Sequence, residues 1–289
     1  YRLLPIATVP LHFFVLIANA WVVGTETLSI IIVFALALTA GAYSGIGIST
    51  GHELGHKNTT LEKWMAKILL AVPIYGHFSI EHNRGHHIWV ATPEDPASAR
   101  MGESIYAFAC REMSGAFIRG FKLERQRLAN KGQSFWSVEN DLLQSYGLSA
   151  LLQGGLIYAF GWIMLPFLVI HNFWAWFILT SANYIEHYGL LRVKLLNGRY
   201  EKCQPHHSWN ANFIISNIQF FHIQRHSDHH ANPTRRYQSL RNFEHIPQMP
   251  IGYHGMYMLA YFPPLWFRLM DKRLLSLPHI NGDLNKVNR

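Results

Sequence analysis

Charged residues are scarce in this sequence and absent from three long stretches. Only 15% of its 289 residues are charged, and no Asp, Glu, Lys or Arg occurs in residues 3–23, 27–51 or 142–185. About 20 apolar residues suffice to span a bilayer as a helix, which rises ~1.5 Å per residue. The first two stretches are therefore each long enough for one span, and the third for two. Such runs are hard to place in the core of a soluble domain of this size, so we expect an integral membrane protein.

Cysteine is nearly absent as well. Cys110 and Cys203 are far apart and show no CxxC spacing, which excludes a disulfide framework and a thiolate metal site. We expect both thiols to be free. Basic residues interleaved with aromatic residues are also missing, so nucleic acid is not expected as a partner despite the net charge of +8. Excess Lys and Arg on the cytoplasmic side of a membrane protein is expected instead.

The charge pattern predicts an all-α fold in a single membrane-embedded domain, residues 1–289. We place four spans and two cytoplasmic parts, the spans at residues 3–23, 27–51, 145–165 and 167–187 and the cytoplasmic helical cap at residues 52–141 and 188–289. Lys57, Lys63 and Lys67 follow the second span and place its end in the cytoplasm. A turn near Leu165–Pro166 would return the chain to that side. An even number of spans places every histidine motif on one face of the membrane.

Histidine, by contrast, is abundant and gathered in four short motifs. They read HELGH at residues 52–56, EHNRGHH at 81–87, NYIEH at 183–187 and QRHSDHH at 224–230. Imidazole is the commonest metal ligand of proteins, and residues three or four apart share a helix face. That spacing is found in the pair His52/His56, the pair His82/His86 and the triplet His226/His229/His230. Nine imidazoles are too many for one ion and a natural number for two.

The residues alone leave the metal and the enzyme class open. Imidazole suits zinc, copper, iron and nickel. Four or five nitrogen ligands for each of two ions would crowd tetrahedral zinc but are normal for five- or six-coordinate iron. HELGH also matches the HExxH pattern of zinc peptidases, in which two histidines hold zinc and the glutamate acts as the base. A membrane zinc metallopeptidase therefore remains an alternative, although it would leave most clustered histidines without a role.

Each motif also contains an acidic residue. Carboxylates commonly orient a ligating imidazole through its other N–H, and we expect this role for Glu53, Glu81, Glu186 and Asp228. Local solvation is the competing interpretation for each of them.

The histidine spacing resembles the three histidine boxes of the membrane di-iron superfamily, which includes fatty-acyl desaturases, fatty-acid and sterol hydroxylases and hydrocarbon monooxygenases. The residues within the motifs are similar to those of the AlkB-type alkane monooxygenases; they read HELGHK, EHNRGHH, NYIEHYG and QRHSDHH. The resemblance implies two iron ions and no catalytic residue beyond the metal ligands, which would be His52, His56, His82, His86, His87, His187, His226, His229 and His230. It also implies six spanning helices, the first two of which would precede this chain.

For function, the resemblance implies terminal hydroxylation of n-alkanes to primary alcohols with O2. The site would face the cytoplasm from the bacterial inner membrane. No motif of a flavin, haem or iron–sulfur carrier occurs, and the resemblance implies rubredoxin as electron donor, fed by an NAD(P)H-dependent reductase. Arg235, Arg236 and Arg241 are candidates for docking this acidic protein. A xylene-type monooxygenase and a fatty-acyl hydroxylase or desaturase of the same superfamily remain alternatives.

Alkanes partition into the lipid bilayer, so we expect a substrate tunnel that opens between spans and ends at the metal site. Ile48 and Gly45 lie one and two turns before His52 and are candidates for its narrow end. Small residues at four-residue spacing also let helices pack closely. Both interpretations of Gly45 stay open.

Overall fold

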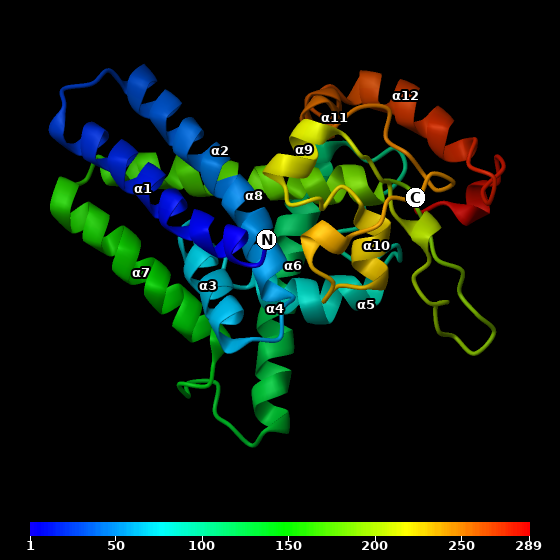
Figure 1. The fold of residues 1–289 in the computed structure, drawn as a ribbon, viewed down its shortest axis with the longest axis horizontal. Coiled ribbons are helices and arrows are strands. Elements are labelled where there is room, and N and C mark those ends of the chain that lie inside the picture. Colours follow the sequence, from blue (N-terminus) through cyan, green and yellow to red (C-terminus); the bar gives the residue numbers. More distant parts are fainter. The chain divides into compact units, whose positions relative to one another are not determined.

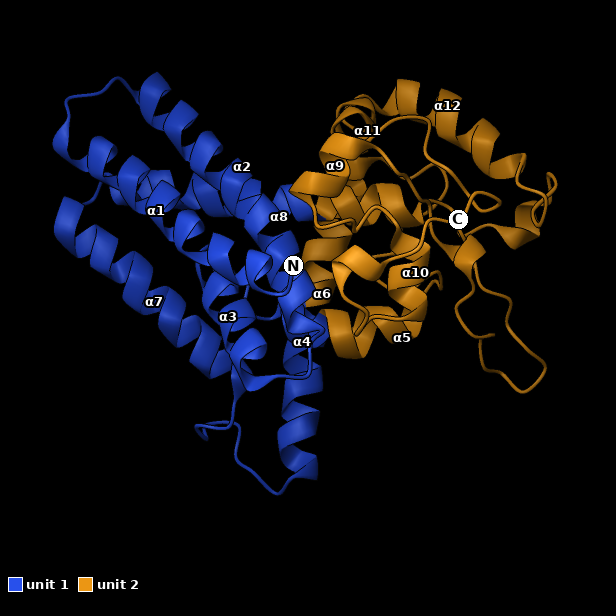
Figure 2. Cartoon of the chain, viewed as in Figure 1, with its two compact units in different colours: residues 1–81, 117–179 blue, residues 82–116, 180–289 orange.

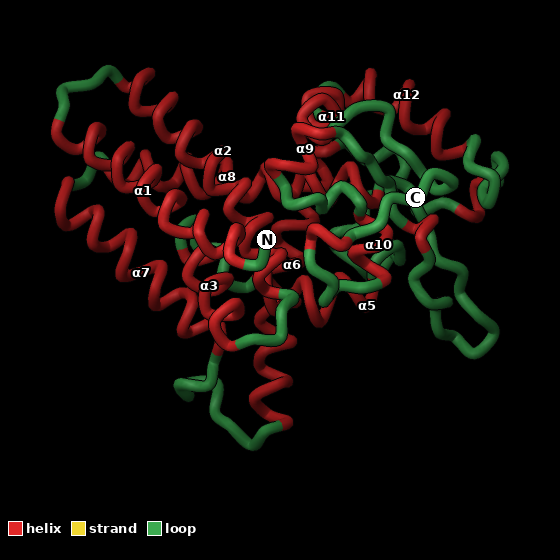
Figure 3. Tube along the Cα trace, in the orientation of Figure 1, coloured by secondary structure: helices red, strands yellow, loops and turns green.

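The computed structural model describes residues 1–289 and confirms the predicted all-α fold. Helices are joined by loops without any strand (Figure 3). Extended pairing is limited to isolated bridges that join Leu190 to Val287, Lys194 to Tyr200 and Asn210 to Gln248. The longer helices are α1 (Leu3–Thr25), α2 (Ile30–Gly55), α3 (Thr60–Ala71), α6 (Ile105–Asn130), α7 (Asp141–Phe160), α8 (Met164–His187) and α12 (Pro263–Leu275) (Figure 1). The shorter ones are α4 (Phe78–Glu81), the π-helix η1 (His82–His86), α5 (His87–Trp89), the 3-10 helix η2 (Pro205–His207), α9 (Ile214–Gln219), α10 (His226–Ala231), η3 (Tyr237–Ser239), α11 (Tyr253–Ala260) and η4 (Leu284–Lys286).

The chain divides into two compact units (Figure 2). Unit 1 comprises residues 1–81 and 117–179, and unit 2 comprises residues 82–116 and 180–289. Both α6 and α8 contribute residues to each unit. The first histidine motif lies in unit 1, and the seven other clustered histidines lie in unit 2. The single domain over residues 1–289 stays a prediction.

Three helices are long and apolar enough to cross a membrane, namely α1, α2 and α8. Large apolar side chains on them are exposed, as Phe14 on α1 (67%) and Ile31 on α2 (76%) illustrate. A continuous surface of this kind is unfavourable in water but is the ordinary surface of a helix in lipid. The structure therefore agrees with the predicted membrane protein.

α7 is not among these three helices, so length and composition do not yield the predicted four spans. Polar residues on its buried face are the reason. Ser149 donates a hydrogen bond to the carbonyl of Ala71 at 2.9 Å, and Gln153 donates to the carbonyl of Val72 at 2.9 Å. These contacts satisfy polar groups inside unit 1, as neighbouring helices also do within membranes. As a fourth span, α7 stays a prediction.

The turn between α7 and α8 lies at residues 161–163, not near Leu165–Pro166 as predicted. Gly161 ends α7 with a φ of +79°, a conformation that glycine adopts without a steric penalty. Pro166 lies in the first turn of α8, where the N–H that proline lacks is not needed. The predicted spans 145–165 and 167–187 thus correspond to α7 and α8 with shifted bounds.

Close packing surrounds the end of α2 that carries the first histidine motif. A Cβ atom added at Gly45 would lie 2.8 Å from Cβ of Ile178 on α8, so the glycine lets these helices approach. Ile48 is 1% exposed and belongs to a small apolar cluster with Tyr75 and Phe78. The structure supports the packing role of Gly45, while a tunnel lined by Gly45 and Ile48 stays a prediction.

Candidate metal centre

Four histidines of unit 2 form what we call the inner cluster: His86, His187, His226 and His230. One ring nitrogen of each lies within 4.8 Å of those of the others, and all four side chains are buried. Nε2 of His226 lies 3.0 Å from Nε2 of His187 and 2.9 Å from Nε2 of His230. The four histidines come from η1, the end of α8 and α10. Three separate sequence motifs therefore meet at one point.

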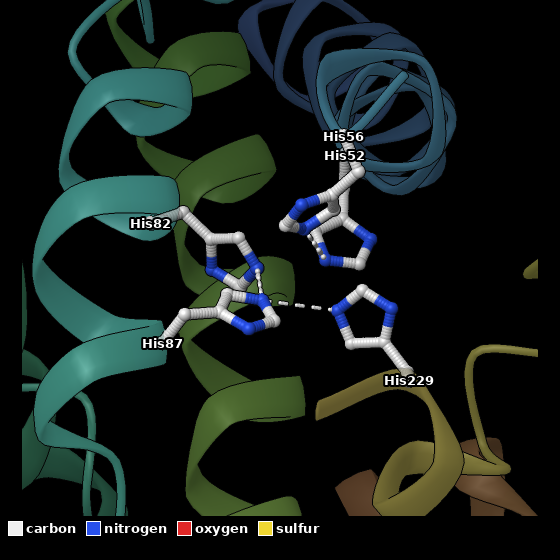
Figure 4. A group of neighbouring side chains, drawn as sticks. All are labelled: His52, His56, His82, His87 and His229. Carbon is white, nitrogen blue, oxygen red and sulfur yellow. Dashed lines mark hydrogen bonds between the residues drawn. The ribbon is translucent and has the colours of Figure 1, made fainter. Parts of the chain in front are cut away.

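Three further histidines of unit 2 form the outer cluster: His82, His87 and His229. Nε2 of His87 lies 3.0 Å from Nε2 of His82 and 3.1 Å from Nε2 of His229. Figure 4 shows these three rings turned toward one another. The two clusters adjoin, because the ring centroids of His87 and His230 are 4.5 Å apart.

The π-helix η1 decides which histidine joins which cluster. The sequence spacing predicts that His82 and His86 act together on one helix face. In a π-helix the hydrogen bonds run from residue i to i+5, and His82 accordingly meets His87, five residues on. His86 instead joins the inner cluster. The spacing left open which histidines would bind together, and the structure places His82 beside His87 and His86 beside His187 and His230. Their role as metal ligands stays a prediction.

His52 and His56 form a pair at the end of α2 in unit 1. Their Nε2 atoms are 3.2 Å apart, as expected for residues one helical turn apart (Figure 4). Between them in sequence, Glu53 forms a buried ion pair with Lys57 at 3.0 Å. The predicted role of Glu53 in orienting an imidazole stays a prediction.

The spacing of the nitrogen atoms fits a bound metal ion. Ligands at right angles around an ion ~2.1 Å away lie about 3.0 Å apart, whereas tetrahedral ligands lie about 3.4 Å apart. The Nε2–Nε2 distances of 2.9 to 3.2 Å in all three groups match the right-angled arrangement.

The protonation state of the inner cluster also suits a metal. Burial lowers the pKa of His230 well below its ordinary value of 6.5, and repulsion by neighbouring imidazoles lowers this pKa further. The ring is therefore neutral at pH 7 and has a nitrogen lone pair to offer an ion.

Glu186 lies against the inner cluster. One carboxylate oxygen is 3.3 Å from Nε2 of His226, and the other accepts a hydrogen bond of 2.6 Å from the hydroxyl of Tyr253. Burial and the nearby carboxylate raise the pKa of Tyr253 well above 10, so its hydroxyl keeps its proton and donates. The contact differs from the predicted one, because Nε2 is the nitrogen that also faces His187 and His230.

Asp228 and Glu81 are bound to arginines. Asp228, on α10, accepts hydrogen bonds from Arg235 at 2.6 Å and from Arg241 at 2.8 Å, in place of the predicted contact with an imidazole. Burial by itself raises the pKa of Asp228, but these hydrogen bonds outweigh it and hold the pKa below 3.8. Glu81 accepts a hydrogen bond of 2.7 Å from Arg119 within unit 1. Asp228 therefore anchors α10, the helix that carries three of the clustered histidines.

Asp95 is a site residue that the sequence analysis missed. It is fully buried, and its carboxylate lies 2.9 Å from Nδ1 of His86 and accepts a hydrogen bond of 2.7 Å from Ser98. An acceptor at Nδ1 favours the tautomer in which Nε2 is free to bind an ion. No periodicity in the sequence signals this contact, because Asp95 lies nine residues after His86 and beyond the end of a helix.

Comparisons with known proteins agree with this site. Residues 28–262 match the family model described as "Fatty acid desaturase". The chain is 55% identical to alkane 1-monooxygenase 1 of Alcanivorax borkumensis over 99% of its own length and 70% of that protein. It is also 55% identical to alkane 1-monooxygenase of Ectopseudomonas oleovorans, over 99% and 71% of the two chains. The hydroxylase component XylM of a xylene/toluene monooxygenase from Pseudomonas putida is 32% identical over 78% of this chain and 59% of that protein.

Proposed function

Because the chain belongs to the fatty acid desaturase family and, within it, to the alkane 1-monooxygenases, we propose that it hydroxylates the terminal carbon of n-alkanes. The co-substrate is O2, the product is a primary alcohol, and the cofactor is a pair of iron ions. The similarity to alkane 1-monooxygenases over nearly the whole chain is the observation that carries this proposal. The lower identity to the xylene/toluene enzyme favours an alkyl over an aryl-methyl substrate.

The nine clustered histidines are the proposed ligands. The inner cluster would hold one iron, and the remaining histidines of the set would supply the ligands of the other. A zinc peptidase built on HELGH would use only two of the nine histidines, His52 and His56, and one more ligand. It would leave the inner cluster unexplained, so we do not favour that alternative.

Iron is needed because a terminal C–H bond has no charge, lone pair or acidity on which a side chain can act. Bound iron would supply the activation of O2. The protein's own task is to hold and orient the ligands and to keep water away from the reacting carbon. Asp95 at His86 performs the orienting part, and burial of the inner cluster performs the exclusion.

The proposed setting is the bacterial inner membrane, with α7 as a fourth span and with all nine histidines at the cytoplasmic face. Substrate would enter from the lipid and reach the irons past Ile48 and Gly45. Replacement of Gly45 by a bulky residue should then shorten the accepted alkane. Because such a side chain would also collide with Ile178, the product chain-length profile must be read together with iron content.

Rubredoxin, reduced by an NAD(P)H-dependent reductase, is the proposed electron donor. Arg235, Arg236 and Arg241 would attract its acidic surface. Since Arg235 and Arg241 also bind Asp228, charge reversal at these positions should be scored as rubredoxin-dependent turnover per bound iron. An unchanged dependence on rubredoxin concentration would remove them as the docking site.

The direct test is to quantify iron in the purified protein and to supply octane, O2, rubredoxin and reductase. Octan-1-ol should accumulate, as measured by gas chromatography. The control variant His245→Ala removes an exposed histidine outside the clusters and should behave as wild type. Iron-loaded protein that converts p-xylene but not octane would contradict the alkane assignment, and full activity with zinc alone would contradict the iron assignment.

A further inference from the structure

A third group of potential metal ligands lies in unit 2 outside both clusters. One ligand atom each of Glu201, His206 and His207 lies within 4.8 Å of the others. The ring of His279 adjoins them, with its centroid 4.6 Å from that of His206. Glu201 follows the bridge between Lys194 and Tyr200, His206 and His207 lie in η2, and His279 follows α12. Three separate segments therefore bring these side chains together.

His207 is not available as a ligand, because both of its nitrogens are used. Its Nδ1 accepts a hydrogen bond of 2.9 Å from the backbone N–H of Gln204. In a neutral imidazole with an acceptor Nδ1, the proton is on Nε2. Nε2 lies 3.4 Å from Oε1 of Glu201, which also accepts a hydrogen bond of 2.7 Å from the N–H of Val193. His207 and Val193 thus fix the carboxylate through one oxygen and leave Oε2 for another partner.

The remaining donors form a set suited to a divalent ion. Neither His206 nor His279 has a hydrogen bond to another residue, and the ring of His206 adjoins the rings of both His207 and His279. Burial, helped by His206 and Lys286 and opposed by Glu201, lowers the pKa of His279 to about 4. The rings of His206 and His279, whose pKa values are both lowered, are then in the neutral form that binds metal at pH 7. Nearby Arg192 is directed to backbone carbonyls, including that of Glu201.

We propose that Glu201, His206 and His279 form a separate site for a divalent transition-metal ion such as Zn²⁺. Two imidazoles and one carboxylate are a known ligand set for zinc and leave a position for water. The ion ties the hairpin before η2 and the segment after α12 to η2 itself. The segment that contains η2 is linked to the inner cluster, because Trp209, just after η2, donates a backbone hydrogen bond of 2.8 Å to the carbonyl of Glu186. The ion is therefore a structural support and takes no part in oxidation.

The test uses the full chain, free of any histidine tag and loaded with iron, so that the nine clustered histidines are occupied. Zn²⁺ is titrated in, unbound metal is removed, and zinc and iron are counted in the same sample. We expect a single additional zinc ion per chain with the iron content unchanged. His206→Ala and the more conservative Glu201→Gln should weaken zinc binding ~10-fold or more, whereas His245→Ala should not change it. Equal zinc binding by His206→Ala and His245→Ala, or zinc uptake only in exchange for iron, would overturn the site.

A second measurement tests the support role. Lys194 and Arg199 are exposed in the hairpin before η2 and are sites for trypsin. Zinc should slow cleavage at these positions in the wild type and not in His206→Ala. Equal cleavage rates with and without zinc in the wild type would contradict the proposed tie between the segments.

Discussion

The inner and outer clusters are built from overlapping elements, yet they differ in their distance from solvent. Both take residues from the segment around η1 and from α10. Every inner imidazole is at most 8% exposed, whereas His87 in the outer cluster is half-buried. Two carboxylates lie against the inner cluster, Asp95 at Nδ1 of His86 and Glu186 at Nε2 of His226, and only the first is placed to orient a ring. The comparison shows that one sequence motif can contribute to both clusters, because its consecutive residues His86 and His87 belong to different ones.

This difference has a consequence for the proposed irons. An ion in the inner cluster would be surrounded by buried ligands, so its exchange with solvent requires local opening of unit 2. Because His87 is half-buried, solvent can reach the outer position more easily than the inner one. The two positions should therefore respond differently to the loss of a single imidazole.

The largest expected effect follows from removing one ligand in each cluster. Both His230→Ala and His87→Ala should lower octane hydroxylation by ~100-fold or more, because loss of even an orienting partner of a ligand costs 10- to 100-fold. Added imidazole should restore part of the activity and the iron content of His87→Ala, since that site reaches solvent. It should not restore His230→Ala, whose side chain is buried. Rescue of both variants to the same degree would remove the distinction between the clusters.

A smaller effect is expected from the carboxylate behind the inner cluster. Asp95→Asn should reduce iron affinity ~10- to 100-fold, because the tautomer and orientation of His86 are no longer fixed. Ser98→Ala removes the neighbouring hydroxyl but keeps the carboxylate, and it is the matched control. Iron titration of the two variants gives the comparison. An affinity of Asp95→Asn equal to that of Ser98→Ala would show that the carboxylate does not support the ligand.

The smallest effect concerns acid stability and lies outside both clusters. Burial lowers the pKa of His77 in unit 1 to about 4, whereas the same group titrates near 6.5 when unfolded. Its contribution to stability is therefore complete above pH 6.5 and is lost as the pH falls toward 4, because the unfolded state binds the proton first. Each pH unit in this window lowers the free energy of unfolding by ~1.4 kcal/mol, so the total loss of stability from His77 reaches about 3 kcal/mol near pH 4.

Replacement of His77 tests this expectation. His77→Asn keeps a hydrogen-bonding group near Tyr146, the partner of Nδ1 at 2.8 Å. The midpoint of thermal unfolding should fall less between pH 7 and pH 5 in this variant than in the wild type. Equal slopes in the two proteins would assign the acid sensitivity to the histidine clusters instead.

Much of unit 1 could be predicted because its signals are local. Charge-free runs gave α1 and α2 within a few residues, and the long third run gave α7 and α8. The exact turn could not be predicted, since both Gly161 and Pro166 are plausible breaks and only Gly161 adopts the conformation that ends a helix. The number of spans was harder still. Gln153 and Ser149 weaken the apolar signal of α7, and only packing shows that their polar groups are satisfied.

The sequence indicated which histidines gather in clusters but not which other residues contact them. The identity of the histidines follows from motif spacing, and the iron assignment followed from resemblance. By contrast, Asp228 looked like a partner for an imidazole and is bound to arginines, while Asp95 had no signal at all. Glu201, His206 and His279 likewise come from segments whose proximity no spacing rule predicts.

The sequence by itself determined which segments are helical and apolar, and which residues are able to bind metal. Both properties depend on side-chain chemistry and on spacings of a single turn. Only the tertiary structure decided how the histidines are shared between the inner and outer clusters and which carboxylates support them. That division depends on a π-turn at residues 82–86 and on contacts between residues far apart in the chain. Local periodicity cannot encode such contacts, because their partners are chosen by packing.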